Sequence, residues 1–123
     1  MLAIDRTYVG VALLWAVAGM LLGLYMGIAA DTTLRSMHVA MVLVAFVTPA
    51  IYGIIYRLWP KLKAAPLARV QFWITQLGAA GIVIGSYFYA INGSVPLVAG
   101  ASIVFIVGAA LMAWLFVSNG SEA

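Results

Sequence analysis

Residues 8–28 read YVGVALLWAVAGMLLGLYMGI, a run of 21 residues without a charged side chain. Such a run matches the ~20 apolar residues that a helix needs to cross the ~30 Å hydrocarbon core of a bilayer. Three further apolar runs of similar length follow, at residues 38–59, 71–91 and 97–117. The sequence therefore predicts an all-α fold, an integral membrane four-helix bundle that forms a single transmembrane domain over residues 1–123.

The overall composition agrees with a membrane protein. Hydrophobic residues make up 67% of the chain and charged residues 7%, and the mean hydropathy is +1.17. A soluble domain carries about 25% charged residues. The net charge of +3 does not indicate nucleic-acid binding, because the charges are confined to the short gaps between apolar runs. The absence of cysteine excludes disulfides, iron–sulfur clusters and thiolate metal sites.

The distribution of Lys and Arg predicts the orientation. Five of these residues flank the first span and the middle loop on one side: Arg6, Arg57, Lys61, Lys63 and Arg69. Only Arg35 lies on the other side. By the positive-inside rule, we expect both termini in the cytoplasm and the protein in the inner membrane of a bacterium. Four aromatic residues near span ends are expected to act as interfacial anchors: Tyr8, Trp59, Tyr89 and Trp114.

Small residues recur at helical spacing in two spans. The first span contains Gly19, Gly23 and Gly27, and the third contains Gly78, Gly81 and Gly85. Small residues let membrane helices approach closely, which predicts packing within the bundle or, alternatively, an oligomer seam along the first span. In the second span, Pro49 is expected to kink the helix or to open a gap beside it, with Thr48 satisfying a freed carbonyl.

His38 is the only histidine, and the interiors of the four spans contain no Asp, Glu or Lys. An imidazole at the mouth of a membrane helix can ligate a metal or haem, titrate as a switch, or hydrogen-bond polar groups at the interface. A zinc site needs three or four protein ligands, which this chain lacks. A haem supplies four of the six iron ligands itself, so one histidine suffices. Haem b, with its iron bound by His38, is therefore the predicted cofactor.

Three neighbours of His38 complete the predicted haem site. Val42 lies one helical turn after His38 in the sequence, and Ala45 lies seven residues after His38, on the same face of a regular helix. Arg35 lies one turn above, where a guanidinium pairs with a haem propionate or serves as an ordinary interfacial arginine.

Other polar residues are interpreted as structural. Gln76 is expected to hydrogen-bond across helices, as buried amides in membranes do. Four more polar residues inside the spans are interpreted in the same way: Gln71 and Thr75 in the third span, and Tyr52 and Tyr56 in the second.

Two motifs resemble the catalytic subunit of haem–copper oxidases. The stretch RSMHV at 35–39, followed by Ala45-Phe46 and by IYR at 55–57, resembles its second helix, most closely in the C-family oxidases and nitric oxide reductases. The stretch FWITQL at 72–77 is similar to the Phe-Trp-x-x-Gln-Leu that opens the third helix of the C family. The resemblance implies a fold like one four-helix arc of that subunit, with His38 as a low-spin haem ligand.

The chain also departs from that family. The family subunit has twelve helices, and the histidines of its tenth helix and of its copper site have no counterpart here. We therefore do not expect this chain alone to reduce oxygen or nitric oxide. The missing second ligand predicts a homodimer in which His38 of each protomer ligates one haem; a trimer of five-coordinate sites is the alternative.

These observations predict a haem b protein of the membrane that carries electrons or holds haem. The alternative is a cofactor-free assembly or interaction subunit that shares the oxidase-like fold. A small multidrug transporter has the same size but needs a carboxylate embedded in its first span, which residues 8–28 lack. The sequence names no redox partner.

Overall fold

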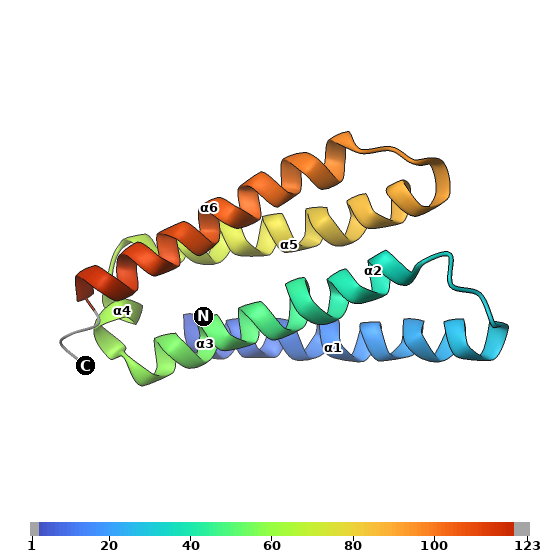
Figure 1. Cartoon of the computed structure of the whole chain (residues 1–123). Coiled ribbons are helices and arrows are strands. Elements are labelled where there is room, and N and C mark those ends of the chain that lie inside the picture. Colours follow the sequence, from blue (N-terminus) through green and yellow to red (C-terminus); the bar gives the residue numbers. More distant parts are fainter. Residues whose placement is uncertain (1–2, 120–123) are drawn as a thin grey trace.

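The computed structural model describes residues 3–119, and this part of the chain is built of helices and short connections (Figure 1). In chain order the elements are α1 (Ile4–Ala29), α2 (Arg35–Val39), the π-helix η1 (Ala40–Val47), α3 (Thr48–Leu58), α4 (Pro60–Ala64), α5 (Leu67–Asn92) and α6 (Pro96–Asn119). The segments α2, η1 and α3 form one continuous rod.

Four helical segments of the described chain are long and apolar enough to cross a membrane: Ile4–Ala29, Arg35–Leu58, Leu67–Asn92 and Pro96–Asn119. This confirms the predicted all-α four-helix bundle and identifies a multi-pass membrane protein. The observed α1 and α5 begin about one turn before the predicted spans at residues 8 and 71. Hydropathy alone placed the starts too late, because the first turn of each helix carries a charged residue, Asp5 in α1 and Arg69 in α5.

The helices form two antiparallel hairpins. In Figure 1, α1 lies beside the rod α2–η1–α3, and α5 lies beside α6. The short helix α4 connects the hairpins at the end where α1 begins and α6 ends. Leu62 of α4 is completely buried there, so the predicted middle loop contains a short helix that closes this end of the bundle. We call this the basic end, because it carries all Lys and Arg residues except Arg35.

Glycines set the contact between α5 and α6. A Cβ added to Gly85 would lie 2.6 Å from the backbone nitrogen of Val98, and one added to Gly78 would lie 2.8 Å from the Cα of Phe105. The two backbones approach closely only because these side chains are absent. In α1, Gly19 faces Val42 and Gly23 faces His38, whereas a Cβ at Gly27 would have no atom of the described chain within 4 Å. Packing within the bundle is thus confirmed for these glycines apart from Gly27.

The rod departs from a regular α-helix just before Pro49. Residues 40–47 form a π-helix, in which each turn holds about one residue more than an α-helical turn. Both the backbone N–H and the hydroxyl of Thr48 bond to the carbonyl of Leu43, the hydroxyl at 3.0 Å. The Thr48 hydroxyl therefore adds to a carbonyl that its own backbone N–H already reaches, so the predicted bond to a carbonyl freed by Pro49 is wrong. The irregularity that accompanies Pro49 is a widened turn.

Replacing Gly85 by alanine should destabilise the bundle. The new Cβ would collide with the α6 backbone at Val98, and overpacking of this kind costs about 1–3 kcal/mol. The free energy of unfolding, measured by SDS titration in mixed micelles, checks this. Gly100→Ala in α6 is the control, because a Cβ there meets no atom of the described chain within 4 Å. Equal stability of the two variants would contradict the proposed contact.

Candidate functional site

His38 lies on α2 with its ring directed at α1. Its Nδ1 is 3.0 Å from the carbonyl oxygen of Gly19. A Cβ added to Gly23, one turn further along α1, would lie 2.9 Å from Cε1 of the ring. The imidazole therefore occupies a gap that exists only because residue 23 has no side chain.

This hydrogen bond defines the tautomer of His38. A carbonyl oxygen only accepts, so Nδ1 carries the proton and donates it to Gly19. In the neutral ring Nε2 then holds the lone pair, and this atom has no hydrogen-bond partner within residues 3–119. The ring is partly exposed. A neutral imidazole held through Nδ1–H with Nε2 available is the arrangement in which histidine ligates metals.

The other three residues predicted to contact haem do not all lie beside His38 in the structure. Val42 stays with His38, because its Cγ2 lies against Gly19, 3.3 Å from where a Cβ would be. Ala45 is 1% exposed and packs instead into an apolar cluster with α5 residues such as Ala79 and Val83. Arg35 is exposed and lines a pocket that it shares with Tyr89 near the end of α5. The structure thus brings His38 and Val42 together, but not Ala45.

The π-helix explains why Ala45 leaves the face of His38. A spacing of seven residues returns to the same face only at 3.6 residues per turn. One π-turn adds a residue, which rotates the following positions by about 100° relative to a regular helix. Because η1 begins at Ala40, the rotation falls between His38 and Ala45.

Within residues 3–119, no group of three or more His, Cys, Asp or Glu side chains gathers as a metal-ion site would require. A porphyrin places a smaller demand on the protein, because it brings four iron ligands of its own. His38 offers one imidazole, oriented by its hydrogen bond to Gly19.

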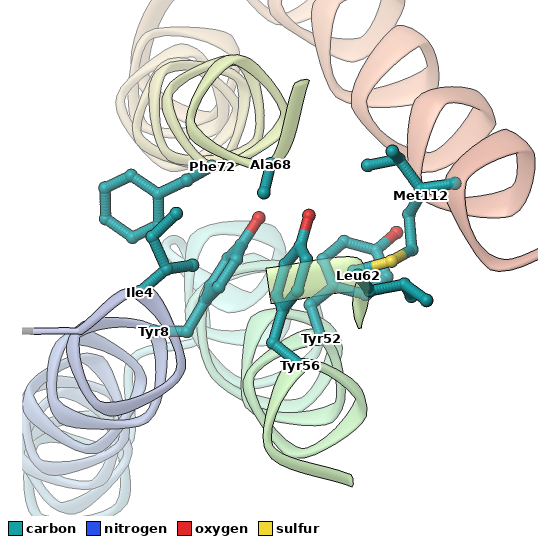
Figure 2. Packing of buried hydrophobic residues seen from close by; sticks show 9 residues of the cluster. Ile4, Tyr8, Tyr52, Tyr56, Leu62, Ala68, Phe72 and Met112 are labelled. Carbon is teal, nitrogen blue, oxygen red and sulfur yellow. The ribbon is translucent and has the colours of Figure 1, made fainter. Parts of the chain in front are cut away.

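A second polar cluster lies in the centre of the bundle at the basic end. The hydroxyl of Tyr56 donates to Oε1 of Gln71 at 3.1 Å, and that of Tyr8 donates to the same oxygen at 2.5 Å. Figure 2 shows both hydroxyls pointing from α1 and α3 toward α5. The Nε2 of Gln71 donates to Thr75 at 3.0 Å and to the carbonyl of Gly108 in α6 at 3.1 Å. One amide therefore connects all four long helical segments.

Two sequence predictions about this region are wrong. Tyr8 is not an interfacial anchor, because its side chain is completely buried and its ring lies 4.8 Å from that of Phe72. Gln76 is not the amide that bonds across helices; Gln71 is, and the Nε2 of Gln76 is buried without a hydrogen-bond partner in the described chain. Trp114 and Tyr89 are more than half exposed, as anchors should be.

The sequence also gave no role to Asp5. Its side chain is 4% exposed, and its carboxylate lies 3.4 Å from Nη1 of Arg57 and 3.6 Å from Nζ of Lys63. Three elements, α1, α3 and α4, meet at this group. The sequence did contain an indication of this ion pair: a single acidic residue lies within one turn of the first apolar run, on the same side of the membrane as the basic middle loop.

Comparisons with known proteins found no match to this chain among protein-family models, curated proteins or solved structures.

Replacing Gln71 by leucine should destabilise the protein. Two buried phenols and the carbonyl of Gly108 would lose their partner, which costs about 1–3 kcal/mol. Gln76→Leu is the matched control, since the Nε2 that it removes makes no hydrogen bond in the described chain. SDS titration of both variants checks this, and equal loss of stability in both would show that the Gln71 network contributes nothing.

Proposed function

We propose that this protein binds haem b in the membrane, with Nε2 of His38 as an axial iron ligand. The observation that supports this is the hydrogen bond from Nδ1 to Gly19, which orients the ring and fixes the tautomer needed for ligation. The haem iron, when bound, supplies one-electron chemistry between its ferric and ferrous states. The protein then serves as an electron carrier or holds haem for transfer.

The chain's own residues have distinct tasks in this proposal. His38 provides the ligand, and Val42 adds an apolar contact one turn away on the same side of the rod. Arg35 is exposed at the end opposite to the basic end, where its guanidinium pairs with a propionate. The likeness of RSMHV and FWITQL to the C-family oxidase helices supports the same assignment for His38.

The second axial ligand comes from another copy of the chain in this proposal. His38 is the only histidine, and its ring is partly exposed at the side of the bundle. Beyond Gly23, the surface of α1 is open at Gly27, where no atom of the described chain covers the helix. A two-fold axis beside this surface would bring two His38 side chains to one haem. A trimer would leave each iron five-coordinate.

The membrane orientation is part of the same proposal. Five of the six Lys and Arg residues lie at the basic end, which supports placing that end and both termini in the cytoplasm of a bacterium. His38 and Arg35 then lie in the outer half of the inner membrane.

A cofactor-free assembly subunit is the second candidate. The observation that favours it is that the His38 ring already fills the gap at Gly23 and ties α2 to α1 by a hydrogen bond. In that case His38 is a packing residue, and no haem accompanies the purified protein.

The absorption spectrum of the detergent-purified protein separates the two candidates. We expect a Soret band, with sharp α and β bands on reduction from a six-coordinate haem, and loss of all three in His38→Ala. A protein that stays colourless after haem is supplied during expression and added back would overturn the haem proposal.

Gly23→Ala should weaken haem binding without removing the ligand. The new Cβ, 2.9 Å from Cε1, would displace the ring and strain the bond to Gly19. Loss of such an outer-shell bond lowers metal affinity by about tenfold or more. Haem titration followed at the Soret band checks this. Gly10→Ala is the control in the same helix, because a Cβ there meets no atom of the described chain. Equal haem affinities in the two variants would contradict this role of Gly23.

A further inference from the structure

A groove of about 420 Å³ lies between the first halves of α1 and α5, away from His38. Ile4 and Val11 line it from α1, and Phe72 and Trp73 line it from α5. The ring of Phe72 is nearly buried and meets Trp73 edge to face, with centroids 5.3 Å apart. The walls are therefore apolar and held in place by aromatic packing, which suits a hydrocarbon chain.

One polar atom beside the groove requires a partner. Gln76 lines the groove, and its Nε2 is buried beneath the groove surface without an acceptor in the described chain. A buried amide donor without an acceptor costs free energy, and the hydrocarbon of a bilayer offers no water to replace one. A half-turn of the Gln76 amide would bring Nε2 to the groove surface, where the carbonyl oxygen of a ligand would accept its hydrogen bond.

A second pocket continues the groove toward the basic end. It measures about 290 Å³, and Lys63 and Arg69 line it together with Ile4. Arg69 and Ile4 line both pockets, so the two pockets are neighbours at these side chains. Nζ of Lys63 also lies 3.6 Å from the Asp5 carboxylate. The guanidinium of Arg69 has five N–H donors, so it can bond to several acceptors at once. The pocket therefore combines two cations at the mouth of an apolar groove.

We propose that this double pocket binds one anionic glycerophospholipid. The phosphate lies between Lys63 and Arg69, one acyl chain follows Phe72 and Trp73, and its ester carbonyl accepts from Gln76. Charge complementarity selects this occupant over a neutral lipid, because the polar end of the site is cationic. The apolar groove selects it over free phosphate, which would leave the hydrocarbon surface uncovered. The site does not depend on haem binding.

Native mass spectrometry of the delipidated protein in detergent tests this, with phosphatidylglycerol, phosphatidylcholine and inorganic phosphate as separate probes. We expect one phosphatidylglycerol to be retained per chain, weaker retention of phosphatidylcholine, and no competition by inorganic phosphate. Arg69→Gln should weaken phosphatidylglycerol binding about fivefold, the usual effect of one cation near an anionic headgroup.

Arg6→Gln is the matched control, because it removes the same charge from the same end of the bundle but lies outside both pockets. Gln76→Leu provides a second variant that breaks no hydrogen bond of the described chain, and it should weaken binding about threefold. Equal retention of the two lipids, or equal effects of Arg69→Gln and Arg6→Gln, would show a non-specific lipid contact and overturn the proposal. Displacement of the lipid by phosphate alone would overturn it as well.

Discussion

The structure depends on the close approach of helix backbones at glycine. In lipid there is no hydrophobic force to draw apolar helices together, so association relies on contact between closely fitting surfaces. Gly78 and Gly85 allow α5 to lie against the backbone of α6, and Gly19 allows α1 to lie against the rod α2–η1–α3. The same property creates the place for His38, because the imidazole fits where Gly23 has no side chain. Packing and the candidate site therefore share one physical cause.

Polar side chains add specific connections to this framework at opposite ends. Near the outer end proposed here, Nδ1 of His38 bonds to the backbone of α1, which leaves Nε2 for a ligand. At the basic end, the amide of Gln71 links Tyr8, Tyr56 and the backbone of α6. Both the oxygen and the nitrogen of the Gln71 amide form hydrogen bonds within the protein. By contrast, Nε2 of His38 and Nε2 of Gln76 have no hydrogen-bond partner in the described chain. A buried or oriented polar group without a partner needs an explanation, and a bound ligand is one such explanation.

The π-helix η1 shows how one local irregularity redistributes residues among the helix faces. Pro49 cannot donate a backbone hydrogen bond, and the turn before it widens so that Thr48 bonds to Leu43. The extra residue in this turn separates His38 from Ala45 and directs Ala45 into the contact with α5. The proline was visible in the sequence, but the rotation follows from the extra residue of the π-turn, which only the structure shows.

The sequence by itself determined the four membrane helices, because an apolar run of about 20 residues has few other stable states and every backbone group in lipid must bond within its own helix. It also identified His38 as the candidate ligand and the glycines as positions of close helix contact. Only the tertiary structure decided which polar residues have partners. Asp5 pairs with Lys63, and Gln71 bonds to Tyr8, Tyr56 and Gly108. These partners lie far apart in the sequence, and no periodicity within one helix indicates them. Pairing between helices depends on their relative rotation and depth, which are set by packing across the whole bundle.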